Sequence, residues 1–273
     1  MTYVELQVTT SRSFLRGASH IEELFATAAA LGLAALGVTD RASVGGMVRA
    51  HQRAKESGVR LVPGCRIDPA DAPALLLYPT DRPAWSRLTR LLTLGKRRAG
   101  KGGCRLDWND IAAASEGMLA VLLPADPATL PPHLDRLAEA FADRAYLALT
   151  PARRPGAAAR LETLARAARA HRVAPLATGD VRYHVPERRI LADVLTCIRE
   201  GCTIDTAGAR LDCGAEHHLR APAEMARLLA RHPEAIARTG ELAGRCAFSL
   251  DDLSYQYPSE TEDPALGPQQ TLE

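Results

Sequence analysis

The chain opens with Tyr3-Val-Glu-Leu-Gln-Val-Thr-Thr10, in which apolar and polar side chains alternate as far as Val8. This period of two predicts a β-strand. The stretch Ser13-Phe-Leu-Arg-Gly-Ala-Ser19 follows as a loop. Residues 21–31 then have a helical pattern, with Ser19 as the expected N-cap and Glu22 completing a capping box.

The same order of strand and helix repeats along the chain. About seven short apolar runs are joined mostly by helical segments, a pattern typical of a parallel α/β sheet or barrel. The expected strands are 3–8, 34–38, 59–63, 74–78, 118–123, 146–149 and 173–178. The expected helices are 21–31, 44–56, 81–94, 107–114, 133–141 and 157–172, followed by 190–199, 222–230 and 234–246. Periodicity alone does not separate an open sheet from a closed barrel.

The composition is that of an ordinary globular protein. The 273 residues are 47% hydrophobic and 24% charged, and the net charge of +2 is too small to indicate nucleic-acid binding by itself. No apolar run is long enough to span a membrane and no signal peptide opens the chain, which favours a cytoplasmic location and no membrane partner. Six cysteines form no C-x-x-C pair and are expected to be reduced. His217 and His218 form the one histidine cluster, without partner ligands nearby in the sequence.

Several longer motifs carry a family resemblance. The opening strand and its loop ending in Gly-Ala-Ser, Gly37-Val-Thr-Asp40 and Lys55-Glu-Ser-Gly-Val-Arg-Leu-Val-Pro-Gly64 resemble the first three motifs of the polymerase-and-histidinol-phosphatase (PHP) domain. Segments 88–98, 180–188, 193–205 and 216–228 are similar to the translesion branch of the bacterial error-prone C-family DNA polymerases. Residues 268–273 resemble the start of the segment that leads into the polymerase palm, so we expect a fragment of a longer polymerase.

The resemblance implies a fold and its division into parts. PHP domains form a distorted seven-stranded (β/α) barrel, here with a C-terminal helical extension. We therefore expect the PHP-like α/β barrel at 1–195 and the helical extension towards the palm at 196–256. Residues 257–273 are polar and rich in proline and are expected to form a linker or tail.

The resemblance also locates the metal ligands of active PHP domains, and most are replaced. The ligand positions read Gln7, Thr9, Asp40, Arg41, Arg66, Pro124, Asp180 and Arg182. The first strand normally carries His-x-His where Gln7 and Thr9 stand. Guanidinium groups cannot bind a divalent cation, so we expect no metal, no cofactor and no catalytic residue in this chain. As an alternative, Glu5, Asp40, Asp180 and His184 could form a degenerate single-metal site.

Lost metal ions would leave the remaining carboxylates repelling one another. We therefore expect at least one of Arg41, Arg66 and Arg182 to contact Asp40, Asp180 or Glu5. If Arg66 makes such a buried contact, its replacement by alanine would cost about 3–5 kcal/mol.

The densest basic stretch comprises Lys96, Arg97, Arg98 and Lys101, interrupted by glycines. It is either a contact with a nucleic-acid backbone or a solvated loop. The glycines lack the strand-to-helix context of a phosphate-binding loop.

The function implied by the resemblance is that of the longer protein. It is a DNA-directed DNA polymerase for translesion synthesis after DNA damage, a nucleotidyltransferase that uses Mg²⁺ outside this chain. The domain itself is expected to be a structural platform for the palm and thumb, with DNA bound through the longer polymerase. Two alternatives remain: a metal-dependent phosphoesterase or 3′–5′ proofreading exonuclease, and an interaction module for mutagenesis-complex proteins or the sliding clamp.

Overall fold

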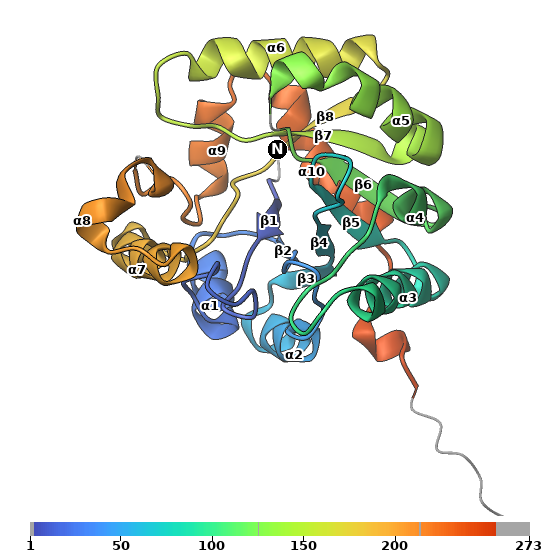
Figure 1. The fold of residues 1–273 in the computed structure, drawn as a ribbon, viewed down its shortest axis with the longest axis horizontal. Coiled ribbons are helices and arrows are strands. Elements are labelled where there is room, and N and C mark those ends of the chain that lie inside the picture. Colours follow the sequence, from blue (N-terminus) through green and yellow to red (C-terminus); the bar gives the residue numbers. More distant parts are fainter. Residues whose placement is uncertain (1–2, 125, 213, 255–273) are drawn as a thin grey trace, which may run out of the picture.

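The computed structural model describes residues 3–124, 126–212 and 214–254. Within them, eight strands form two sheets surrounded by helices (Figure 1). The first sheet is parallel and has the order β1-β2-β3, with bounds Glu5–Val8, Ala35–Val38 and Arg60–Pro63. The second has the order β4-β5-β6-β7-β8, with bounds Cys65–Ile67, Leu75–Pro79, Met118–Leu122, Ala145–Leu149 and Ala174–Ala177.

The expected closed barrel of seven strands is corrected by this arrangement. The run 59–63 is followed by a second short strand, β4, and the two are separated by Gly64 alone. A Cβ at Gly64 would lie 2.7 Å from the Tyr78 ring, so only glycine lets the backbone pass there. β4 then pairs antiparallel with β5, and β5 pairs antiparallel with β6. Isolated bridges, Val8 to Val181 and Arg41 to Arg66, join the two sheets in place of continuous ladders.

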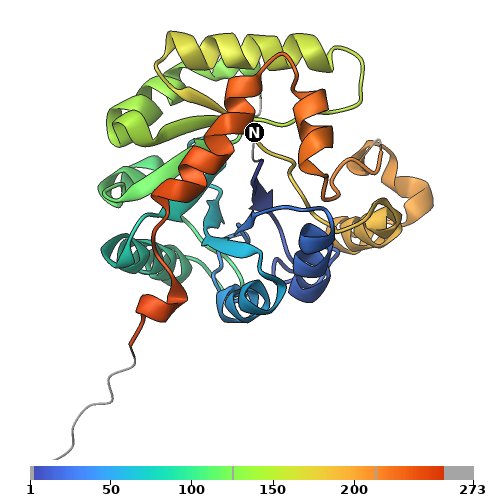
Figure 2. The same ribbon diagram turned by 180° about the vertical axis from the view of Figure 1, so that it is seen from behind.

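The strands bury both of their faces, which explains their continuous apolar runs. One set of side chains, such as Leu75 and Leu122, packs against the surrounding helices. The alternate set, such as Leu6 and Val121, meets in an interior cluster that α10 (Pro233–Arg245) covers with Leu242 and Ala243. Figure 2, seen from behind, shows α10 in orange-red crossing in front of the strands. The strands therefore form a rigid frame with the carboxyl ends of β1, β2 and β8 near one another.

The remaining α-helices lie around the strands. Their bounds are Ile21–Ala30 (α1), Met47–Ser57 (α2), Arg82–Arg98 (α3), Trp108–Ala113 (α4), Pro131–Phe141 (α5), Ala157–Ala170 (α6), Arg189–Glu200 (α7), Ile204–Ala207 (α8) and Pro222–Leu228 (α9). None of them is long and apolar enough to cross a membrane, in the residues that the structure describes.

Two expected N-caps are wrong, although α1 begins at Ile21 as expected. The N-cap of α1 is His20, which forms its capping box with Glu23, whereas Ser19 is buried one residue earlier. α2 begins at Met47 after Gly46, so Ser43 is not its cap. Gly58 does end α2, in the left-handed conformation with φ of 72° that glycine adopts without strain.

The C-terminal part is closely joined to the strands. The expected boundary between residues 195 and 196 falls inside α7. α10 packs against β8 and β1, and the Thr239 hydroxyl accepts a hydrogen bond of 3.0 Å from the Val4 backbone N–H. The expected tail at 257–273 lies outside the described residues.

Candidate functional site

The carboxyl ends of β1, β2 and β8 bring together most of the candidate residues. Glu5 and Gln7 belong to β1, Asp40 follows β2, and Asp180 follows β8. Thr9 donates its backbone N–H to Val181 at 2.8 Å, which ties the end of β1 to the segment after β8. We call Glu5, Gln7, Asp40, Asp180 and Arg182 the strand-end cluster.

Asp40 is fully buried, and its carboxylate is occupied by donors from the loop after β1. Oδ1 accepts from the Thr10 N–H at 2.8 Å and from the Ser13 hydroxyl at 2.7 Å, and Oδ2 accepts from the Thr10 hydroxyl at 2.8 Å. Burial raises the pKa of Asp40, and these hydrogen bonds together with the charge of Arg12 oppose that rise. Asp40 therefore holds the loop after β1 in place through these hydrogen bonds.

The Glu5 side chain is also buried, and both of its carboxylate oxygens accept hydrogen bonds. Its Oε1 accepts from the backbone N–H groups of Gln7 at 2.8 Å and Gly179 at 3.1 Å, and its Oε2 accepts from the Tyr3 hydroxyl at 2.6 Å. Burial raises the pKa of Glu5, and the same hydrogen bonds oppose the rise. A Cβ at Gly179 would lie 2.3 Å from Oε2, so any side chain there would displace the Glu5 carboxylate.

Asp180 is held by side chains from three segments. Gln7 Nε2 donates to its Oδ1 at 2.7 Å, and Arg182 donates to its Oδ2 at 2.8 Å. His217 Nδ1 lies 2.9 Å from the Asp180 carbonyl oxygen and 3.2 Å from Oδ2. The backbone of Asp180 has a φ of 48°, which is strained for a residue with a side chain. These contacts hold that conformation in place.

The expected arginine contact is confirmed at Arg182. Its guanidinium joins Asp180 to Asp212, whose Oδ2 lies 2.9 Å away. The pKa of Arg182 is raised, since Asp180 and Asp212 outweigh the burial that disfavours its charge. The His217 hydrogen bond lowers the pKa of Asp212, and Arg182 adds to that effect while burial opposes it. A guanidinium thus provides positive charge beside a family ligand position.

Arg41 and Arg66 have a different partner from the expected one. Both donate to Asp68, which follows β4, with Arg66 Nε at 3.0 Å from Oδ1. The Arg66 side chain is 31% exposed and shares its carboxylate with Arg41. Arg66 is therefore not a buried charge paired with Asp40, Asp180 or Glu5, and the expected cost of about 3–5 kcal/mol for Arg66→Ala does not apply.

The other candidates lie apart from the carboxylates. Pro124 follows β6 and carries no ligand atom in its side chain. His184 Nδ1 lies 2.7 Å from the Ser19 hydroxyl, and burial lowers the pKa of His184. Arg98 pairs with Asp110 at 2.5 Å, whereas Lys96 and Lys101 line a separate cavity. Arg97 is exposed on α3.

The donor set of the cluster does not fit the metal centre of active PHP domains. Glu5 and Asp40 give their oxygens to internal donors, and Asp180 faces an amide and a guanidinium. In the part of the chain that the structure describes, no group of three His, Cys, Asp or Glu side chains is arranged to hold a metal ion. The sequence did not connect His217 with this cluster, because its partner Asp180 is 37 residues away along the chain.

Comparison with known proteins shows what the chain resembles. The family model described as "PHP domain" matches residues 5–174. The chain is 54% identical over 273 residues to "Error-prone DNA polymerase 1" of Agrobacterium fabrum, covering 99% of this chain and 25% of that protein. It is 50% identical over 278 residues to "Error-prone DNA polymerase" of Caulobacter vibrioides, again covering 99% and 25%. The chain thus spans about a quarter of the length of these curated relatives.

A solved structure supports the fold. An amidohydrolase from Chromobacterium violaceum superposes with a TM-score of 0.51 at 15% identity, over 66% of this chain and 88% of that one. At this identity the similarity concerns the fold alone.

Proposed function

The chain belongs to the PHP domain family, and we propose that it serves as a non-catalytic platform within an error-prone DNA polymerase. The proposal is supported by relatives at about half identity that are four times as long and are named error-prone DNA polymerases. The longer protein would carry out Mg²⁺-dependent nucleotidyl transfer in translesion synthesis and DNA repair, in the cytoplasm. The palm and thumb in the rest of that chain would be the principal partners.

The observation that carries the non-catalytic role is the saturation of the three carboxylates. A metal-dependent phosphoesterase needs free carboxylates or imidazoles to hold the ion that activates its water. Here Asp180 is engaged by Gln7 and Arg182 instead. Without a bound ion, nothing in the cluster lowers the pKa of a water towards neutrality.

Hydrolysis assays test this role directly. We expect the purified chain to cleave neither single-stranded DNA nor a generic phosphomonoester, whether Mg²⁺, Mn²⁺ or Zn²⁺ is added. Turnover that disappears in Asp180→Ala would establish the phosphoesterase or proofreading alternative and overturn our proposal. Turnover that survives this change would come from a contaminating enzyme.

A surface on α7 supports the platform role. Ile190, Val194 and Ile198 recur every four residues, and Ile190 and Ile198 are 75% and 60% exposed. They form one apolar stripe, whereas the buried side of α7 contributes Cys197. Figure 1 places α7 and α8 at the periphery, away from the strands. Exposed apolar stripes of this kind mark contact surfaces. We assign the stripe to the rest of the polymerase chain, the three quarters of the relatives that this chain does not cover.

The stripe can be tested by charge insertion. Ile198→Asp should leave the melting temperature of this chain unchanged, because the side chain is already solvated. In the full-length polymerase it should lower the melting temperature and promote proteolysis between the domains. The control is Val48→Asp on α2, which is similarly exposed at 66% but lies outside the stripe. Equal melting temperatures and equal proteolysis of the two full-length variants would contradict the assignment of the stripe to the rest of the polymerase chain. If full-length Ile198→Asp keeps its melting temperature but no longer binds a mutagenesis-complex protein, the interaction-module alternative would be favoured.

A further inference from the structure

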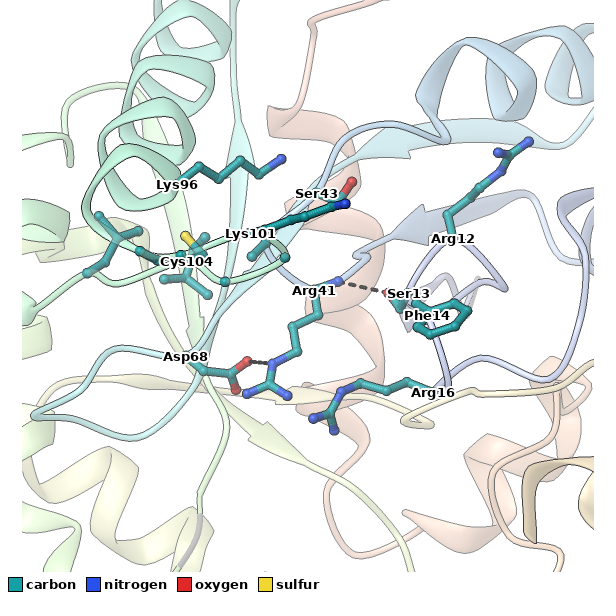
Figure 3. A pocket seen from close by; sticks show the side chains of 17 residues that line it. Arg12, Ser13, Phe14, Arg16, Arg41, Ser43, Asp68, Lys96, Lys101 and Cys104 are labelled. Carbon is teal, nitrogen blue, oxygen red and sulfur yellow. Dashed lines mark hydrogen bonds and ion pairs between the residues drawn. The ribbon is translucent and has the colours of Figure 1, made fainter. Parts of the chain in front are cut away.

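A cationic cavity of about 880 Å³ lies beside the strand-end cluster. Four segments line it: the loop after β1, the loop after β2, the end of β4 with Asp68, and the last turn of α3 with the loop that follows it. Among the residues at family ligand positions, Arg41 lines the cavity. The cavity lining does not contain Gln7, Asp40, Asp180 or Arg182. Figure 3 shows side chains from these segments converging on the cavity.

The charges around the cavity are strongly unbalanced. Its lining contains the cationic side chains of Arg12, Arg16, Arg41, Lys96 and Lys101. Asp68 is the carboxylate among the described lining residues, and it is already shared by Arg41 and Arg66. Within the described residues, the side chains of Arg12, Arg16, Lys96 and Lys101 make no ion pair. Such a concentration of unpaired cations in a concave site attracts anions.

The pKa of Arg16 reflects the repulsion between these neighbouring cations. Burial and the neighbouring guanidinium groups of Arg41 and Arg199 lower the pKa of Arg16 to about 10. Arg16 stays charged at neutral pH, but in surroundings that disfavour its charge. A bound phosphate would relieve this repulsion and pair with the guanidinium in a planar geometry.

Phe14 lies at the rim of the cavity and is 83% exposed. The residues on either side of it are fixed. The Ser13 hydroxyl donates to Asp40 at 2.7 Å, and the Leu15 carbonyl accepts from Arg199 at 2.7 Å. Leu15 has a φ of 57°, so the loop is held in a strained turn. Figure 3 shows Phe14 among the side chains that line the cavity, together with Arg16 and Arg41.

We propose that this cavity binds single-stranded nucleic acid, with backbone phosphates among Arg16, Lys96 and Lys101 and an unpaired base stacked on Phe14. Cationic grooves combined with exposed aromatic rings are the usual means of binding single strands. A duplex keeps its bases stacked inside, so it could not offer one to Phe14 without unpairing. All the side chains of this site belong to the chain's own surface, and the site would bind a single strand whether or not the chain is a platform for the polymerase.

Binding of a fluorescein-labelled oligothymidylate to the 273-residue chain, followed by fluorescence anisotropy, tests the charges. The double variant Lys96→Glu/Lys101→Glu should weaken binding by about tenfold or more and flatten its dependence on salt concentration. Both lysines are exposed, so the fold should persist. Arg90→Glu is the matched control, because Arg90 is exposed on α3 outside the cavity. Absence of binding by the parent chain, or equal losses in the double variant and the control, would overturn the proposal.

Phe14→Ala tests the stacked base. Loss of one stacking interaction should weaken binding by about 5- to 100-fold. Val48→Ala, a similarly exposed apolar truncation on α2, should have no effect. Duplex DNA, inorganic phosphate and polyglutamate should compete poorly with the oligonucleotide. Unchanged binding in Phe14→Ala together with equal competition by polyglutamate would show general anion binding and refute the proposed nucleic-acid site.

Discussion

Arg182 shows how one side chain can take over part of the role of a metal ion. It stands two residues after Asp180, at a family ligand position, and its guanidinium reaches both Asp180 and Asp212. This pairing could be anticipated from the sequence, because the charge left behind by lost metals needs compensation. The partners of Arg41 and Arg66 could not be anticipated, because Asp68 follows a three-residue strand with arginine at its centre.

Arg182→Ala should lower the free energy of unfolding by about 1–3 kcal/mol, between the values for exposed and buried ion pairs. The Arg182 side chain is 35% exposed and Asp180 is 16% exposed, so solvent screens the pair in part. His217 also remains close to Asp180 and limits the loss. Urea denaturation measures the effect. Arg66→Ala, the comparison variant, should cost about 0–1 kcal/mol, and a larger loss for Arg66→Ala than for Arg182→Ala would refute our assignment.

Glu5 should give the stability of the chain a distinct pH dependence. Its pKa is raised above the ordinary 4.5, so the folded state holds this proton more tightly than the unfolded state. Its contribution is therefore fully present below pH 4.5 and is lost as the pH rises through the raised pKa. Glu5→Gln removes the ionisation. Relative to the parent, this variant should become more stable as the pH rises from acid to neutral, as measured by denaturation at several pH values. If the difference in free energy of unfolding between Glu5→Gln and the parent does not vary with pH, the raised pKa of Glu5 is contradicted.

Among the elements, most strands and helices could be predicted because the strands are continuous apolar runs and the helices have a regular apolar period. The strand at 118–122 and the helix at 131–141 lie close to the expected 118–123 and 133–141. β4 was missed because three residues give no periodic signal. Ser19 and Ser43 were misassigned as caps, since each suits a cap by type. Ser19 instead accepts the His184 N–H at 3.0 Å, a contact between residues 165 positions apart.

Gly37 should be indispensable to the pairing of β1 with β2. A Cβ there would lie 2.7 Å from the backbone of Leu6, and backbone cannot move aside as a side chain can. Gly37→Ala should therefore destabilise the chain by about 1–3 kcal/mol. Gly244→Ala in α10 is the control, because nothing lies within 4 Å of the added atom. In a helix this change should stabilise the chain by about 0.5–1 kcal/mol. Thermal denaturation distinguishes the two, and similar melting temperatures would contradict the close approach of the strands.

At the scale of the whole molecule, the family resemblance predicted more than local patterns could. It indicated the PHP domain, the strand ends as the site and the replaced ligand positions, and the family match over residues 5–174 confirms the membership. Neither pattern nor resemblance predicted two sheets joined by isolated bridges, because that depends on the turn at Gly64 and the antiparallel pairing of β4, β5 and β6. The cationic cavity also emerges only in three dimensions. Arg16, Arg41 and Lys96 are distant in sequence, and two loops and the last turn of α3 bring them to one cavity.

In this protein, hydrogen bonds and Arg182 hold the strand ends in place of metal ions. Elemental analysis of the purified chain, after equilibration with Zn²⁺ and Mn²⁺ and removal of free ions, measures whether the strand ends still bind a metal. We expect substoichiometric metal in the parent chain and the same low content in Asp180→Ala. A stoichiometric ion in the parent that is lost in Asp180→Ala would contradict the claim and would return the phosphoesterase alternative to first place.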